Sequence, residues 1–263
     1  MAVCASILQI TDLHILSGPD DTFLGINTEH YFHAVLEHAF ANNHHFDLIL
    51  VTGDLAQDPC QASYRRILSR LESYNTPCIC LPGNHDDDIL MQQILNTCLV
   101  NCRKQIFLEN WQLICLNSKL AGSEGGYLSK QELLFLEDCL SSKPDHDALI
   151  AVHHHCVETN GFMDTMIIEN SQELWAVINK HPQVKAITTG HIHQVMDISE
   201  ASVRVLGAPS TCFQFKPESK LFALDATAPG YRLIRLYADG RLESDIIRLP
   251  EQLNELQIDT PGY

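Results

Sequence analysis

The chain has 263 residues, of which 45% are hydrophobic and 19% charged, a composition typical of a folded globular protein and not of a disordered or fibrous one. Its 17 Lys and Arg are outnumbered by 33 Asp and Glu, which gives a net charge of −16. Nucleic acids and anionic membranes bind clustered basic charge, so this balance argues against both as partners. A small phosphate ligand is still allowed, because bound metal ions can reverse the sign of a local site.

The sequence also carries signals about the compartment. No apolar run reaches the roughly 18 residues of a membrane span, and the first residues show no signal-peptide pattern. The ten cysteines are scattered along the chain and form no C-x-x-C pair. We therefore expect free thiols in a reducing, cytoplasmic compartment. The protein is expected to be either a monomer or a homodimer.

Short apolar runs alternate with amphipathic segments over the first 190 residues. Strands are expected at 6–10, 47–51, 78–81, 148–152 and 186–189. Helices are expected at 28–41, after an N-cap at Asp58, and after the capping pairs Ser129/Glu132 and Asn170/Glu173. From about 197 to 249 the pattern changes to strands that complete the second sheet, with a hairpin of 232–237 and 242–249 around a two-residue turn. This order predicts a single α/β domain over 1–263.

Each of the five expected strands is followed by residues of metal-binding type. They are Asp12 and His14, then Asp54, then Asn84, His85 and Asp86, then His153 to His155, and finally His191 and His193. The carboxyl ends of parallel strands meet at one edge of a sheet, where ligands of α/β proteins bind. Any one of these motifs is common on a protein surface, but five in succession predict a metal site. Imidazoles combined with carboxylate and amide oxygens suit Fe, Mn or Zn better than Ca or Mg.

The order of these motifs resembles the calcineurin-like metallophosphoesterase superfamily: D-x-H, G-D, G-N-H-D, a His-rich strand end and G-H-x-H. Four further segments resemble its bacterial class III 3′,5′-cyclic-AMP phosphodiesterases, of the CpdA type. They are Gly-Asp-Leu-Ala-Gln-Asp at 53–58, Gly-His-Ile-His-Gln at 190–194, Pro-Ser-Thr-Cys-Phe-Gln-Phe-Lys-Pro at 209–217 and Ala-Pro-Gly-Tyr at 228–231. The resemblance covers residues 6–249. It implies a four-layer α/β/β/α sandwich with the site at the carboxyl ends of the strands.

The resemblance also implies two metal ions that share one carboxylate. Asp12, His14, Asp54 and His193 would hold one ion, and Asp54, Asn84, His154 and His191 the other. His154 is preferred because it aligns with the first His of the family's His-His-Pro segment, and His153 is the competing choice. Cys156 replaces the proline of that segment, and we expect a packed thiol there and not an additional ligand.

The function implied is hydrolysis of 3′,5′-cyclic AMP to AMP by a hydroxide that bridges the two ions. Asp54 and Asn84 would act in catalysis with His85, which is expected to protonate the leaving ribose oxygen. The substrate would contact His14, Asp54, Asn84, His85 and His193. The alternative for His85 is that it only orients a metal ligand. Asp86 is expected to orient its loop. Phe162 could stack on the adenine base, but we expect it to be a core aromatic residue.

Two other functions remain open from the sequence. A broader phosphodiesterase would use the same two ions on 2′,3′-cyclic nucleotides or other small diesters. A metal-free scaffold on the same fold is disfavoured because every ligand position is filled, and cleavage of DNA or RNA is disfavoured by the acidic composition.

Overall fold

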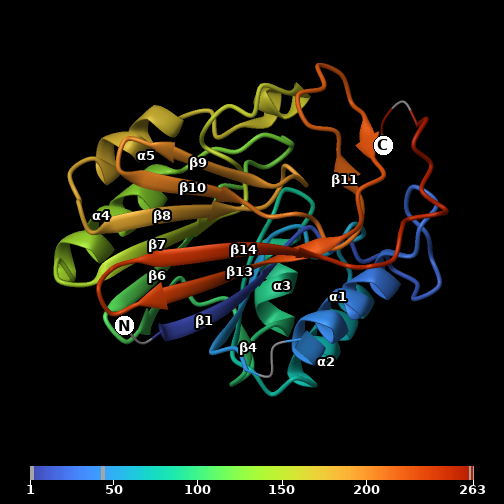
Figure 1. Ribbon diagram of the computed structural model, residues 1–263, viewed down its shortest axis with the longest axis horizontal. Helices are drawn as coiled ribbons and strands as arrows, with labels where there is room; N and C mark the ends of the chain where they lie inside the picture. The colour runs from blue at the N-terminus through green and yellow to red at the C-terminus, as the bar shows by residue number, and fades with distance from the viewer. Residues whose placement is uncertain (1–2, 43–44, 261, 263) are drawn as a thin grey trace.

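The computed structural model describes residues 3–42, 45–260 and 262. Two six-stranded sheets face each other (Figure 1). The first has the strand order β14-β13-β1-β2-β3-β4 and the second β5-β6-β7-β8-β10-β9, and β11 with β12 forms a small separate pair. The first sheet comprises β1 (Val3–Ile10), β2 (Leu48–Thr52), β3 (Cys78–Leu81), β4 (Val100–Asn101), β13 (Gly230–Tyr237) and β14 (Leu242–Arg248). The second comprises β5 (Gln105–Leu108), β6 (Trp111–Leu116), β7 (Asp147–Val152), β8 (Val184–Thr189), β9 (Met196–Glu200) and β10 (Val203–Gly207), while the small pair is β11 (Gln214–Phe215) and β12 (Leu224–Asp225).

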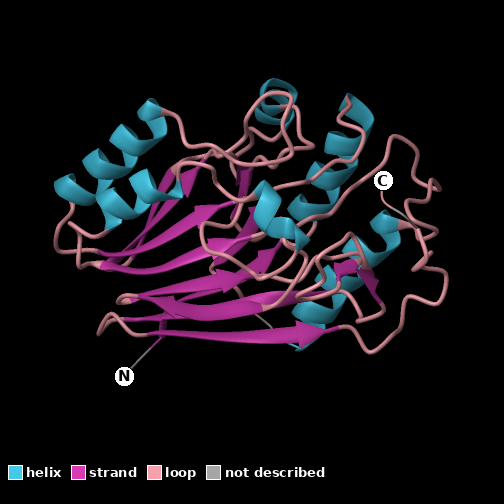
Figure 2. Ribbon diagram, turned by 90° about the horizontal axis from the view of Figure 1, so that it is seen from above, coloured by secondary structure: helices cyan, strands magenta, loops and turns pink. Residues whose placement is uncertain are grey.

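Helices cover the outer face of each sheet (Figures 1 and 2). The first sheet is covered by α1 (Thr28–Asn42), α2 (Gln61–Glu72) and α3 (Asp88–Ile94), and the second by α4 (Lys130–Ser142) and α5 (Ser171–Ile178). A short 3-10 helix, η1 (Phe162–Met166), follows β7. Three apolar clusters fill the spaces between helices and first sheet, between the two sheets, and between second sheet and helices. The predicted four-layer α/β/β/α sandwich is therefore confirmed.

The layer between the two sheets also contains a buried polar link. Gln9 of β1 donates to the carbonyl of Thr189 at 3.2 Å and accepts from the hydroxyl of Thr188 at 2.6 Å, both in β8. On the neighbouring strand β13, the buried Arg232 donates to the carbonyls of Met196 and Gly207 in the other sheet. Because an unpaired polar group in such a layer is costly, these bonds favour one alignment of the two sheets.

The strands that lead to the candidate site run in the same direction within each sheet. β1 pairs in parallel with β2 and β2 with β3, while β6, β7 and β8 pair in parallel in the second sheet. Loops gather at one end of the strands (Figure 2). The metal-binding residue types therefore meet where these strands end.

Three expectations about local structure are wrong. The hairpin β13–β14 does not complete the second sheet: β13 pairs antiparallel with β1 of the first, and only β9 and β10 join the second. The connection of the hairpin is longer than two residues, with Gly240 at φ +79. Helix α2 has its N-cap at Cys60, whose side chain accepts from the backbone N–H of Ser63, and not at Asp58.

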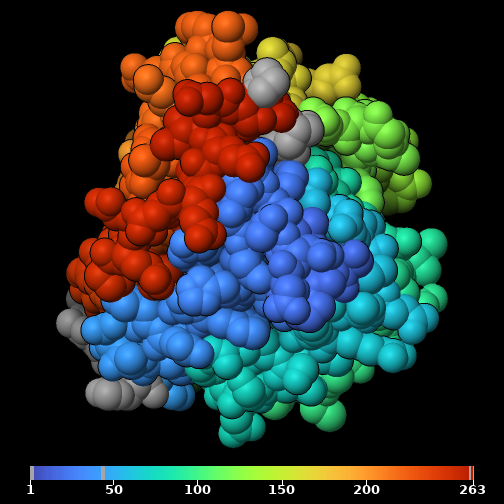
Figure 3. All heavy atoms as spheres, turned by 90° about the vertical axis from the view of Figure 1, so that its right-hand side faces the viewer, coloured from blue at the N-terminus to red at the C-terminus, as the bar shows by residue number. Residues whose placement is uncertain are grey.

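After β14 the chain turns back over the N-terminal part of the molecule (Figure 3). In this region Gln257 N donates to Leu24 O at 2.9 Å. Among the helices of the described residues, none has the length and apolar character that crossing a bilayer requires.

Candidate metal centre

Five loops bring the predicted ligands together from both sheets. Asp12 and His14 follow β1, Asp54 follows β2, and Asn84 and His85 follow β3. The second sheet contributes His153 to His155 after β7, and His191 and His193 after β8. Their ligand atoms form overlapping groups in which all atoms lie within 4.8 Å of one another. These groups are Asp12/His14/His193, His14/Asp54/His85, Asp12/Asp54/His153 and His153/His154/His191.

One half of the site presents two imidazole nitrogens to each other. His14 Nε2 lies 3.2 Å from His193 Nε2. The Nδ1 atom of His193 is 2.9 Å from the carbonyl oxygen of Phe213, and that of His14 is 2.7 Å from Gln57 Oε1. Because both Nδ1 atoms donate to oxygens, both Nε2 atoms carry lone pairs when the rings are neutral. Facing lone pairs repel unless a cation or a proton lies between them, so this pair fits a metal ion.

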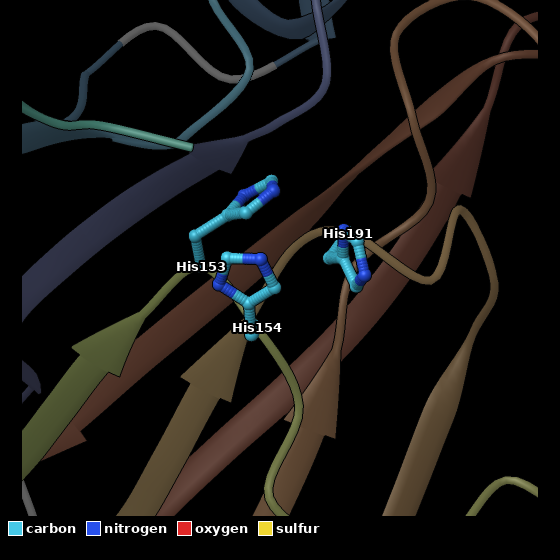
Figure 4. A group of neighbouring side chains, drawn as sticks. All are labelled: His153, His154 and His191. Carbon is cyan, nitrogen blue, oxygen red and sulfur yellow. The ribbon is translucent and has the colours of Figure 1, made fainter. Parts of the chain in front are cut away.

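In the other half of the site, the side chain of His153 lies beside those of His154 and His191 (Figure 4). Its Nδ1 donates to the carbonyl oxygen of Thr52 at 2.8 Å. Its Nε2 lies 3.1 Å from Asn84 Oδ1 and 3.3 Å from Asp54 Oδ2. His191, whose ring lies 5.1 Å from that of His153, has a buried Nε2 with no hydrogen-bond partner among the described residues. An amide oxygen and a carboxylate oxygen thus lie beside His153 Nε2, and a ring nitrogen of His191 lies within 4.8 Å of one of His153.

His154 is bonded differently from His153. Its Nδ1 accepts from the hydroxyl of Ser118 at 2.7 Å, and its Nε2 donates to the carbonyl of Glu124 at 3.1 Å. Both ring nitrogens are therefore occupied by neutral partners. The sequence preferred His154 as the ligand, whereas this hydrogen bonding favours the alternative, His153. The neighbouring Cys156 is buried, and burial raises the pKa of its thiol to about 12, so it is a packed, protonated thiol.

Asp54 is the carboxylate between the two halves. Its Oδ2 lies 3.9 Å from His14 Nε2 and 3.3 Å from His153 Nε2, while Oδ1 accepts from the backbone N–H of His85 at 3.0 Å. The side chain of Asp54 is buried away from solvent. A single carboxylate with one oxygen turned towards imidazoles on both sides has the position that a shared ligand of two ions requires.

The charge states fit cation binding. Burial alone would raise the pKa of Asp54, but the positive charge and hydrogen bond of His153 hold it well below its usual value. Burial lowers the pKa of His14 to about 3 and that of His191 well below its usual value, so both rings are neutral near pH 7. Burial would also lower the pKa of His153, but the carboxylate of Asp54 raises it to about 9. Ionised carboxylates with neutral imidazoles are the forms that bind metals, so Asp54, His14 and His191 are already in those forms, whereas His153 loses a proton when it binds.

Tight backbone geometry holds the two loops of Asp54 and Asn84 together. Gly53 has a φ of +100, and a Cβ there would lie 2.2 Å from His153 Nδ1. A Cβ on Gly83 would lie 2.1 Å from Asp54 Oδ1, so only glycine fits beside this carboxylate.

Asp86 clamps the same two loops. Its buried carboxylate accepts from the backbone N–H groups of Leu55, Ala56 and Gly83 at 2.9–3.1 Å, and from the hydroxyl of Tyr64 at 3.0 Å. Asp86 therefore orients the loops, as the sequence suggested. The partners of the histidines, such as Thr52 and Ser118, could not be predicted from the sequence, because they are ordinary polar residues far away in the chain.

A pocket of about 240 Å³ opens next to the candidate ligands. Its polar lining residues are Asp54, Asn84, His85, Glu124, His191 and His193. Phe162, Phe215 and Phe222 form an aromatic wall with Met163 and Met166, and their rings contact one another at centroid distances of 5.2–5.8 Å. Phe162 is half-buried and lines this pocket, so it is not a fully enclosed core residue.

Two facing sheets that gather His, Asp and Asn side chains at their strand ends define a metal-dependent phosphoesterase. Residues 5–195 match the model of the calcineurin-like phosphoesterase family, and the chain belongs to that family. This confirms the family inferred from the sequence.

Similar proteins of known name cover nearly the whole chain. It is 39% identical over 259 residues to the 3′,5′-cyclic adenosine monophosphate phosphodiesterase CpdA of Escherichia coli strain K12, which covers 98% of this chain and 94% of the relative. It is 41% identical over 249 residues to a 3′,5′-cyclic-nucleotide phosphodiesterase of Nostoc sp. strain PCC 7120, with 94% of each chain covered. A solved dimetal phosphatase from Danio rerio has the same fold, with a TM-score of 0.63 at 14% identity over 94% of this chain and 99% of that one.

Proposed function

We propose that this protein hydrolyses 3′,5′-cyclic AMP to AMP with a pair of metal ions. The observation that carries the proposal is the buried carboxylate of Asp54, which lies between His14 on one side and His153 on the other. Support comes from relatives that are 39–41% identical over almost the full chain and are named as 3′,5′-cyclic-nucleotide phosphodiesterases.

Each ion is assigned four side chains. Asp12, His14, Asp54 and His193 would hold the first ion, and Asp54, Asn84, His153 and His191 would hold the second. His153 replaces His154 in this assignment because its Nε2 faces Asp54 and Asn84 while both nitrogens of His154 have neutral partners. The donor set suits Fe, Mn or Zn. Such a pair of ions would supply Lewis acidity towards the phosphate oxygens and would lower the pKa of a water nucleophile.

The remaining chemistry is done by side chains that line the pocket. Asn84 and His85 lie beside Asp54, where a phosphate would dock. The ribose 3′ oxygen is a poor leaving group, so it needs a proton as its bond to phosphorus breaks. His85 is half-buried, lines the pocket and packs edge-on against His14 at a ring distance of 5.1 Å. We assign it the proton transfer to the leaving oxygen at 3′, which yields 5′-AMP.

The aromatic wall is assigned to the purine. Phe162 and Phe222 line the same pocket as the candidate ligands, and an aromatic base stacks favourably on such rings. The apolar side then accommodates the base and the polar side the phosphate, as in other small-ligand sites.

The test is product analysis with purified protein loaded with Mn²⁺. We expect 5′-AMP from 3′,5′-cyclic AMP, separated by liquid chromatography, and loss of turnover after chelation. No turnover of 3′,5′-cyclic AMP, or turnover of the 2′,3′ isomer alone, would contradict the proposal.

We also propose that the protein works in a reducing compartment, as the cytoplasm is. All ten cysteines lie within the described residues, and all ten are free thiols. Six of them are buried, where a thiol packs as a small apolar group.

A further inference from the structure

The segment 210–215, which follows β10 and has the sequence Ser-Thr-Cys-Phe-Gln-Phe, packs behind one half of the metal centre. It contains no assigned ligand. It nevertheless contacts all three residues that, apart from the shared Asp54, are assigned to the first ion. These are Asp12, His14 and His193.

Asp12 is held by this segment through its own carbonyl oxygen. That oxygen accepts from Ser210 Oγ at 2.8 Å and from Cys212 Sγ at 3.3 Å. The thiol of Cys212 is buried beside this carbonyl oxygen. The backbone of Asp12 has a φ of +54, a conformation that non-glycine residues adopt only when their surroundings enforce it.

The two histidines are held by the aromatic residues of the segment. The carbonyl of Phe213 accepts from His193 Nδ1 at 2.9 Å, and the ring of Phe215 stacks on His193 at 4.4 Å. The ring of Phe213 stacks on His14 at 5.5 Å. The bond from Nδ1 fixes which nitrogen of His193 is left to bind a metal.

The other half of the centre is held by different parts of the chain. His153 donates to Thr52 O at the end of β2, and Asn84 lies on the loop that Asp86 clamps. The two metal positions therefore differ in these supports, although they share Asp54 and the carboxylate of Asp12 accepts from the backbone N–H of His191.

We propose that the segment 210–215 is the positioning element of the first metal position alone, so that weakening it releases one ion and leaves the other bound. This inference rests on the proposed function, because it uses the two-ion assignment. Residues that orient metal ligands typically change affinity by about 10–100-fold when they are substituted.

The experiment compares a double variant, Ser210→Ala with Cys212→Ala, with two controls. Thr211→Val is the first control: Thr211 Oγ1 is buried and has no hydrogen-bond partner among the described residues, so valine removes a hydroxyl that no ligand uses. Cys212→Ser is the second, because serine keeps a donor at this position. Each protein is titrated with Mn²⁺ by calorimetry, its metal content is measured after dialysis, and its metal-free form is tested for cooperative thermal unfolding.

We expect two Mn²⁺ per chain in the wild type and both controls. In the double variant we expect one site of unchanged affinity and one weakened about 10–100-fold. Two sites of wild-type affinity, or equal weakening of both sites, would overturn the inference. If the metal-free double variant does not unfold cooperatively, Cys212→Ala alone is judged by the same criteria.

Failure of the proposed function has a different signature. A wild-type chain that binds two Mn²⁺ but does not hydrolyse 3′,5′-cyclic AMP contradicts the proposed reaction and leaves the comparison of the two sites intact. A wild-type chain that binds fewer than two Mn²⁺ overturns both.

Discussion

Replacing His85 with alanine separates the proton transfer from the metal site. The backbone N–H of His85 donates to Asp54 Oδ1 at 3.0 Å, and alanine retains this bond. The substitution therefore removes the imidazole from the pocket without releasing the carboxylate that the two ions share. We expect the Mn²⁺ content and the thermal stability of His85→Ala to equal those of the wild type.

The turnover of 3′,5′-cyclic AMP should fall steeply. A positioned general acid contributes about 10²–10⁴-fold, which corresponds to roughly 3–5 kcal/mol in the activation barrier. The loss should depend on the leaving group. A p-nitrophenolate needs no proton as it departs, so kcat for bis(p-nitrophenyl) phosphate should fall much less than kcat for cyclic AMP.

Steady-state kinetics of Mn²⁺-loaded protein on both diesters provides the assay. His30→Ala, at an exposed histidine of α1, is the control for loss of an imidazole elsewhere. Equal losses on the two diesters, or a lowered metal content, would refute the acid role and would assign His85 to orienting its neighbours instead.

Three further predictions test other parts of the site. Gly83→Ala places a Cβ 2.1 Å from Asp54 Oδ1, so this variant should lose at least one Mn²⁺. In the control Gly122→Ala the Cβ meets open space, and this variant should bind two Mn²⁺; equal metal contents of the two variants would contradict the prediction. The pKa of His153 is raised to about 9, so its ring is protonated at pH 7 in the metal-free protein. Binding of Mn²⁺ should therefore release a proton, and the affinity should increase as the pH rises towards 9. Calorimetry that gives the same heat of binding in buffers of different ionisation enthalpy would disprove this proton release. Tyr64→Phe removes the hydroxyl that donates to Asp86 and accepts from Asp87 N. The free energy of unfolding, measured in urea, should fall by about 1–3 kcal/mol, and an unchanged free energy of unfolding would contradict this.

The sequence predicts the strands and most site residues because their signals are local. Each apolar run expected as a parallel strand appears as one, and the metal-binding residues lie directly behind it in the chain. Capping is predicted where the side chain has no competing partner: Ser129 accepts from Glu132 N and begins α4 as expected. Asn170 precedes α5 as expected, but its side chain bonds the backbone of Leu128 and does not cap the helix.

The features that the sequence does not predict depend on contacts between distant segments. His153 and His154 are adjacent and chemically identical in the sequence. They are distinguished by Thr52, which is 101 residues from His153, and by Ser118, which is 36 residues from His154. The local sequence predicts the hairpin β13–β14 but not the sheet that it joins. That sheet depends on the antiparallel pairing of β13 with the distant strand β1. Strand β6 (Trp111–Leu116) is not among the strands expected from the sequence.

Backbone strain explains why metal binding and folding should be coupled in this protein. Five assigned ligands have a φ between +46 and +65, namely Asp12, His14, Asp54, His191 and His193. A left-handed conformation costs a non-glycine residue about 1 kcal/mol or more, so the five together cost an amount comparable with the net stability of a typical domain. Hydrogen bonds to the backbone of these residues offset part of this cost, as when Asp12 N donates to Gly53 O and His14 N to Asp54 O. They do not relieve the facing lone pairs of His14 and His193, which only a cation or a proton can satisfy. The strained loops are therefore stable in the arrangement that binds metal, and each bound ion should stabilise the fold by mass action.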